Sequence, residues 1–112
     1  MKESQLQDEI RLALGRVDGL VLWRNNIGVG EVRHGANERG YKIRFGVGGP
    51  GGADLVGIYR GRFVAVEVKT ERGRQTEEQR MFQQLVERKG GVYVVLRSVD
   101  DAQAWVATLE AA

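Results

Sequence analysis

Hydrophobic residues recur near the start of the chain at the three- and four-residue spacing of an amphipathic helix. Leu6, Ile10 and Leu14 mark this apolar stripe, and a glycine stands where the helix should end. The segment "GLVLWRN", residues 19–25, then has the composition of a strand. We therefore predict a helix over residues 2–15 followed by a first strand.

The next part of the chain has little regular pattern. Residues 25–52 are rich in glycine and asparagine, and only "YKIRF", residues 41–45, has the composition of a short strand. Long irregular stretches of this kind in small domains are typically functional or mobile.

Two strands with a tight connection follow. They are "ADLVGIY", residues 53–59, and "RFVAVEVKT", residues 62–70, and only Arg60-Gly61 stands between them. A two-residue turn fixes the register of an antiparallel pair. Counting outward from this turn, we predict that Asp54 lies directly opposite Glu67.

The last part of the chain alternates helix, strand and helix. The second helix should begin at Thr76, because Thr76-Glu77-Glu78-Gln79 matches the capping-box pattern, and it should end at Gly90-Gly91. "VYVVLR", residues 92–97, is an apolar strand typical of a sheet covered on both faces. Residues 98–109 read as a closing helix with a serine or aspartate cap.

The predicted order is helix, three strands, helix, strand, helix (αβββαβα). The fold class that follows is α/β, with a mixed central sheet flanked by helices. The chain of 112 residues should form a single domain over residues 1–112. No repeat or linker interrupts it.

Composition narrows the chemistry. There is no cysteine, so thiol nucleophiles, disulfides and cysteine-bound zinc are excluded. No apolar run approaches the roughly 20 residues that cross a bilayer, so we expect a soluble cytoplasmic protein with no membrane partner. The net charge is only +2, but residues 33–74 hold nine basic side chains against four acidic ones, which permits a nucleic-acid partner.

The two facing acids suggest a metal site. Asp54, Glu67 and Lys69 should share one face of the hairpin, and like charges that close are destabilising unless something offsets them. Oxygen ligands with retained waters suit Mg²⁺ or Mn²⁺. Glu3 lies on the apolar stripe of the first helix and is a candidate third acid, although the helix dipole also favours a glutamate in a first turn.

Lys69 has a separate candidate role. A lysine beside a metal can orient an attacking water and stabilise charge that develops on a phosphate. The alternative is an exposed ion pair between Glu67 and Lys69 at a strand end.

These residues carry a family resemblance. Asp54, the Glu67-Val68-Lys69 triplet, an inward Glu3 and the order of elements resemble the PD-(D/E)XK nuclease superfamily. Within it, "GGADLVGI…EVKTERGRQTEEQRMFQQL…GGVYVVLRS" is similar to the VRR-NUC domain of small stand-alone phage and bacterial proteins, over most of the chain. Two departures are an alanine in place of the proline before Asp54 and the absence of the Val-Arg-Arg tripeptide.

The resemblance implies metal-dependent hydrolysis of DNA phosphodiester bonds in a restriction-endonuclease-like core. By position, Glu3, Asp54, Glu67 and the backbone carbonyl of Val68 would hold Mg²⁺ or Mn²⁺, whether as one ion or two. Lys69 would serve the attacking water. Gln79 matches a family glutamine near the site, and it is equally the N3 partner of the predicted helix cap.

Similar small proteins are homodimers that cut branched DNA such as Holliday junctions, in the cytoplasm of a bacterium or a phage-infected host cell. Two symmetric cuts on a two-fold substrate need two sites. No base-reading motif is visible, so recognition of phosphates and DNA shape is expected. The candidate DNA contacts are Arg24, Asn25, Arg33, His34, Arg44, Arg72 and Arg74.

Alternatives remain open at this point. Arg24 and Asn25 could form only a polar strand end, with Trp23 in the core. The chain could also be a flap-type, exonuclease-type or restriction-type nuclease, or a nucleic-acid-binding or assembly module that has kept the fold without the reaction. "GVGGPGG", residues 46–52, precedes a strand and not a helix, so it is not a dinucleotide site.

Overall fold

The computed structural model describes residues 1–111 as an α/β protein. This agrees with the fold class predicted from the sequence. In chain order the elements are α1 (Glu3–Leu14), β1 (Leu20–Arg24), β2 (Gly28–Val32), β3 (Tyr41–Phe45), the 3-10 helix η1 (Gly49–Gly51), β4 (Leu55–Tyr59), β5 (Arg62–Val68), α2 (Glu77–Arg88), β6 (Val92–Leu96) and α3 (Val99–Ala111).

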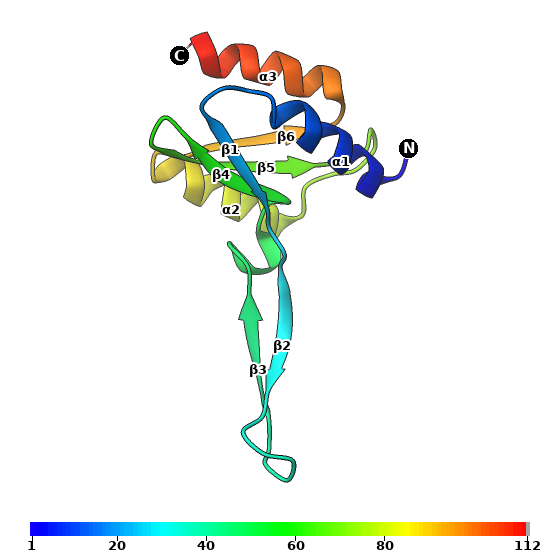
Figure 1. Ribbon diagram of the computed structural model, residues 1–112, viewed down its shortest axis with the longest axis vertical. Helices are drawn as coiled ribbons and strands as arrows, with labels where there is room; N and C mark the ends of the chain where they lie inside the picture. The colour runs from blue at the N-terminus through cyan, green and yellow to red at the C-terminus, as the bar shows by residue number, and fades with distance from the viewer. Residues whose placement is uncertain (112) are drawn as a thin grey trace.

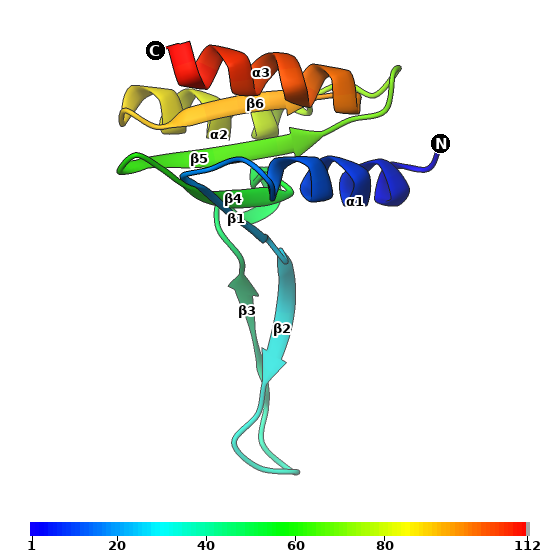
Figure 2. The ribbon, with the colours of Figure 1, turned by 45° about the horizontal axis from the view of Figure 1, so that its top comes forward.

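Four strands form a mixed sheet in the order β1-β4-β5-β6. The first two pairs are antiparallel, and β5 and β6 are parallel because α2 connects them. Helices α1 and α3 lie side by side over one face, and α2 lies on the other, over β5 and β6 (Figures 1 and 2). The predicted sheet flanked by helices is therefore confirmed.

The core has one part on each side of the sheet. Alternate residues of β5 separate the two: Val64, Val66 and Val68 pack in the larger cluster with α1 and α3. Ala65 points to the opposite side and packs with Phe82 of α2. A residue of β5 that alternates with the three valines must therefore point toward the α2 side.

The hairpin between β4 and β5 has the register that the tight turn predicts. Tyr59 pairs with Arg62, and the pairing continues outward to Leu55 and Val66. Arg60 and Gly61, the two turn residues, have positive φ angles of 48° and 79°. Positive φ at both positions is the geometry that matches the twist of two antiparallel strands.

The largest difference from the sequence prediction lies in residues 25–52. We predicted one short strand there, but β2 and β3 form a separate two-stranded antiparallel sheet, which we call the arm. Its segment "GVGEV" was missed because two of its five residues are glycine, which is depleted in strands. The arm projects away from the body (Figures 1 and 2), and the longest dimension of the molecule is 57 Å.

The helix ends agree with the sequence. Thr76 caps α2 and forms the predicted capping box with Gln79, in which each side chain bonds the other residue's backbone N–H. Before α3, the Ser98 hydroxyl accepts a hydrogen bond from the Asp101 backbone N–H. Within residues 1–111, no helix has the length and apolar character needed to cross a membrane.

Asn25 holds the base of the arm. Its side-chain nitrogen donates to the carbonyls of Val47 and Ala53, at 2.9 Å each, and its side-chain oxygen accepts from the Val47 N–H at 3.0 Å. Its backbone N–H also donates to the Asp54 carbonyl. One side chain thus joins the end of β1 to both segments that flank η1.

We call the three hydrogen bonds of the Asn25 side chain the clamp. Truncation of this side chain should lower the stability of the protein. Asn25→Ala removes three hydrogen bonds and leaves their backbone partners unpaired, so we expect the free energy of unfolding to fall by about 2–3 kcal/mol in urea denaturation. Arg24→Ala, on the exposed neighbour, is the matched control and should stay within about 0.5 kcal/mol of wild type. Equal stabilities of the two variants would contradict a structural role for Asn25.

Candidate active site

The two predicted acids come together at one end of the β4–β5 hairpin. Strand pairing ends at Leu55 and Val66, and Asp54 and Glu67 occupy the next position in the same register. The Asp54 Oδ2 atom accepts a hydrogen bond from the Val68 backbone N–H at 2.8 Å. Asp54 therefore reaches across the hairpin to the backbone just beyond Glu67.

Glu67 is buried in an unusual state for a carboxylate. Its side chain is only 2% exposed and points to the α2 side of the sheet. Burial raises its pKa from 4.5 to about 9, together with the hydrogen bond it shares with Asp54 and the charge of that residue. Lys69 lowers this pKa and Glu3 raises it further. At neutral pH and with no metal ion bound, Glu67 therefore keeps its proton.

The Oε2 atom of Glu67 provides the test of whether this site fits a metal. Among the residues that the structure describes, it is the buried side-chain oxygen or nitrogen with no hydrogen-bond partner. A buried oxygen without a partner costs free energy, and a second carboxylate beside it adds repulsion. A divalent cation would offset both effects, so the two acids fit Mg²⁺ or Mn²⁺.

Glu3 is not gathered into this pair. It is exposed at the start of α1, on the other face of the sheet, and within residues 1–111 no three His, Cys, Asp or Glu side chains form a cluster able to hold a metal ion. Its negative charge nevertheless raises the pKa of Glu67. A role for Glu3 as a third ligand stays a prediction.

Lys69 and Gln79 lie on either side of the loop that follows β5. Lys69 is half-buried, and its backbone N–H donates to the Leu96 carbonyl at 3.1 Å. Gln79 uses its side-chain oxygen in the capping box, where it accepts from the Thr76 N–H at 2.9 Å. The capping role of Gln79 is confirmed, and its role near the reaction stays a prediction.

A polar network beside the acids was missed from the sequence. The Gln75 side-chain nitrogen donates to Gln83 at 2.9 Å and to the Tyr93 hydroxyl at 3.2 Å. Burial raises the pKa of Tyr93 to about 12; the bond from Gln75 opposes this, and the charges of Glu67 and Asp54 add to it. No local pattern in the sequence links these three residues, because Gln75 precedes α2, Gln83 lies on α2 and Tyr93 lies on β6.

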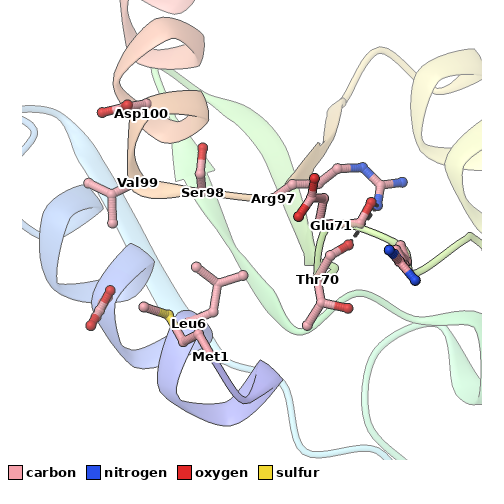
Figure 3. Close-up of a pocket in the computed structure, with 10 residues that line it drawn as sticks. Met1, Leu6, Thr70, Glu71, Arg97, Ser98, Val99 and Asp100 are labelled. Carbon is pink, nitrogen blue, oxygen red and sulfur yellow. Dashed lines mark hydrogen bonds between the residues drawn. The ribbon is translucent and has the colours of Figure 1, made fainter.

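Arg97 anchors the loop after β5. Its guanidinium donates to the backbone carbonyls of Thr70 at 2.8 Å and Gly73 at 2.5 Å, with a longer contact to Glu71 at 3.4 Å. Figure 3 shows Arg97 beside Thr70 and Glu71 at one side of a cavity of about 610 Å³ between α1, the loop and the start of α3. Arg72 also lines the cavity. Nothing in the sequence pattern assigns this role to Arg97.

The candidate DNA contacts fall into two separate groups. Arg44 belongs to the arm, Arg33 and His34 to the loop that joins its two strands, and Arg72 and Arg74 to the loop after β5; all of them are exposed. Arg33 forms an exposed ion pair with Glu31 at 2.9 Å, and the His34 ring lies against Tyr41.

The end of β1 matches neither alternative in full: the one with Arg24 and Asn25 as DNA contacts, or the one with a polar strand end and Trp23 in the core. Arg24 is exposed there, and the Asn25 side chain is engaged in the clamp, which does not leave it available for DNA. Trp23 is 52% exposed, so the alternative that places it in the core is wrong.

The raised pKa of Glu67 predicts how stability depends on pH. Its pKa is about 9 in the folded protein and near 4.5 in the unfolded chain, so the folded state binds the extra proton between these values. With chelator present, stability should be greatest below about pH 4.5 as far as this group is concerned, and it should fall as pH rises toward 9.

Glu67→Gln keeps the neutral form at every pH. We expect it to raise the melting temperature at pH 8.5 in chelator, by the equivalent of about 1–3 kcal/mol, and to have little effect near pH 5. Differential scanning calorimetry across this range measures the difference, with the exposed Glu110→Gln as control. A pH-independent difference between wild type and Glu67→Gln would show that the proton is not responsible.

Comparison with known proteins does not assign the chain to a family. No protein-family model matches it, and no curated protein sequence matches it either.

Proposed function

We propose that this protein is a Mg²⁺- or Mn²⁺-dependent DNA endonuclease of the VRR-NUC type, within the PD-(D/E)XK superfamily. The observation that carries the proposal is Glu67: a carboxyl group that is 2% exposed, has one oxygen without a partner and lies beside a second carboxylate. A protein that needed only a stable sheet end gains nothing from two acids held together there. A metal-binding enzyme requires them.

The metal-binding groups would come from both strands of the hairpin. Asp54 and Glu67 would supply carboxylate oxygens, and the backbone carbonyl of Val68 is next to them along β5. The family resemblance adds Glu3 from the start of α1, with water completing the set. When bound, the metal would polarise a phosphoryl oxygen and lower the pKa of a bound water. The hydrogen bond from the Val68 N–H to Asp54 would hold the Asp54 carboxylate beside β5.

In this proposal Lys69 acts on the water and the phosphate. Its ammonium charge is close enough to the acids to lower the pKa of Glu67, and the residue is two positions further along the same face. A positive charge there would orient the attacking water and stabilise the additional negative charge on the phosphate in the transition state.

The basic groups support a DNA substrate recognised by shape. Arg97 fixes the loop that carries Arg72 and Arg74, so these two side chains stand near the end of β5 that bears the acids. Arginines at such positions bind phosphates and carry no base sequence information. We therefore extend the proposal to structure-selective cutting of branched DNA, such as Holliday junctions, by a homodimer.

The test compares wild type with Lys69→Ala on labelled four-way junction, flap and linear duplex DNA. We expect paired cuts in the junction with Mg²⁺ or Mn²⁺, none with chelator, and a loss of at least about 100-fold in Lys69→Ala. Lys89→Ala, an exposed lysine at the end of α2, is the matched control and should cut like wild type.

The alternatives predict other outcomes. Equal DNA binding by both proteins with no cutting under any condition would favour a binding or assembly module. Cutting that persists in chelator would exclude the metal mechanism. Preferential cutting of flaps, of ends or of a duplex sequence would place the enzyme with flap-type, exonuclease-type or restriction-type nucleases.

Metal binding can be measured without DNA. Titration of Mn²⁺ by calorimetry should show binding to wild type that tightens from pH 6 to pH 8, because the metal displaces the proton on Glu67. Asp54→Asn and Glu67→Gln should each weaken it at least about tenfold, and Glu110→Gln should not change it. Wild-type binding that Glu67→Gln retains would place the metal elsewhere.

A further inference from the structure

The arm has one apolar and one charged face. Tyr41, Ile43 and Phe45 alternate along β3 with Lys42 and Arg44, so the two sets point to opposite faces. On β2, the residues paired with the apolar set are small or apolar: Gly28, Gly30 and Val32. A ribbon with two such different faces fits a partner that offers a different surface on each side.

The apolar face presents exposed aromatic rings along the length of the arm. Tyr41, Ile43 and Phe45 are between 44% and 52% exposed. The Phe45 ring lies over Gly28, where an added Cβ would come within 2.4 Å of it, so the glycine leaves the ring room to lie against β2. Toward the connecting loop, the ring centroids of Tyr41 and His34 are 6.1 Å apart.

The arm also carries the net positive charge of the chain. Residues 28–45, which are the two strands and the loop that joins them, hold four of the 17 basic residues and two of the 15 acidic ones. The remaining 13 basic and 13 acidic residues cancel, so the formal charge of +2 belongs to this segment. Its charge is complementary to a polyanion, and nucleic acid is the polyanion that also offers aromatic surfaces.

The apolar face suits the planes of nucleic-acid bases and not their edges. Recognition of base edges in a groove requires hydrogen-bond donors and acceptors, and the Tyr41 hydroxyl is the one polar side-chain group on this face of the two strands. Aromatic side chains stack on base planes instead, and every base has such a plane. In a continuous duplex the neighbouring bases cover these planes, so the face fits unpaired bases.

The arm leaves the body beside the acid pair. The Asn25 backbone N–H donates to the Asp54 carbonyl at 2.8 Å, and the Asn25 side chain donates to the Ala53 carbonyl at 2.9 Å. These bonds tie the base of the arm to the residue that carries one of the two carboxylates. From this point the arm extends away from the body (Figures 1 and 2). DNA held along the arm would therefore approach the body near the acids.

We propose that the arm binds unpaired DNA bases where they adjoin a duplex. The apolar face stacks on the unpaired bases through Tyr41 and Phe45, and the opposite face contacts phosphates of the adjoining duplex through Lys42 and Arg44. The choice of DNA rests on the proposed function, and the unpaired base is the substrate feature that this inference adds to it. Each copy of the chain holds the complete surface, so the inference does not depend on an oligomeric state.

The first test measures binding by fluorescence anisotropy in chelator at constant salt. The probes are a labelled blunt duplex and the same duplex with a tail of about ten unpaired thymidines. Wild type should bind the tailed probe at least about tenfold more tightly. Tyr41→Ala should weaken binding to the tailed probe by about five- to 100-fold and leave binding to the blunt probe unchanged, because only the tail offers free base planes.

The matched variants separate the two faces. Tyr41→Phe keeps the ring and should bind like wild type, as should Met81→Ala, which removes an exposed apolar side chain from α2. Lys42→Ala should weaken binding to both probes by the same factor and reduce the salt dependence of binding by about one phosphate contact. Circular dichroism and melting curves establish that each variant is folded.

The second test removes the bases and keeps the phosphates. Abasic sites in place of the unpaired thymidines should weaken wild-type binding to the tailed probe at least about fivefold. The loss should be clearly smaller in Tyr41→Ala, because one of the rings that stack on the bases is already absent. Equal losses in the two proteins would mean that the bases contact another part of the molecule and would overturn the proposal.

Two further results would also overturn it. They are equal binding of the tailed and blunt probes by wild type, and equal binding of the tailed probe by Tyr41→Ala and Met81→Ala, which would leave the apolar face to a protein partner. These measurements do not depend on cleavage. Base-dependent binding by a protein that cuts no DNA would overturn the nuclease proposal alone, and metal-dependent cutting with no role for Tyr41 in binding would overturn this inference alone.

Discussion

The candidate site depends on the register of the β4–β5 hairpin. The turn at Arg60 and Gly61, with positive φ at both residues, fixes that register and brings Asp54 to the position beside Glu67. Because side chains alternate along a strand, a slip of one residue would place Glu67 among the valines that α1 and α3 cover. The two-residue turn thus determines on which face of the sheet the carboxyl groups of Asp54 and Glu67 lie.

The acid pair stores unfavourable free energy that the rest of the fold offsets. Glu67 is buried at the end of the α2 side of the sheet, and its neighbours include Asp54 and the buried Tyr93. Val66 and Val68 flank it in sequence and are fully buried on the opposite side, so β5 is held firmly in place. Sites that are costly in the absence of a ligand are typical of function and not of stability.

The arm reflects a second constraint. Gly28 leaves room for the Phe45 ring beside β2, and the alternating sequence of the arm separates an apolar face from a charged one. The Asn25 clamp holds the arm outward. Residues that look like a flexible glycine-rich approach to the acids therefore form a paired, amphipathic element whose apolar side chains are exposed.

The sequence by itself determined the helices, the four strands of the main sheet and the pairing of Asp54 with Glu67, because periodicity, caps and a two-residue turn are local signals. It did not determine β2, whose strand is stabilised by pairing with β3 and not by the propensity of its glycines. Nor did it determine the exposure of Trp23, the hydrogen bonds by which Asn25 holds the base of the arm, or those by which Arg97 holds the loop after β5. Those depend on contacts between residues more than twenty positions apart, and only the tertiary structure brings such residues together.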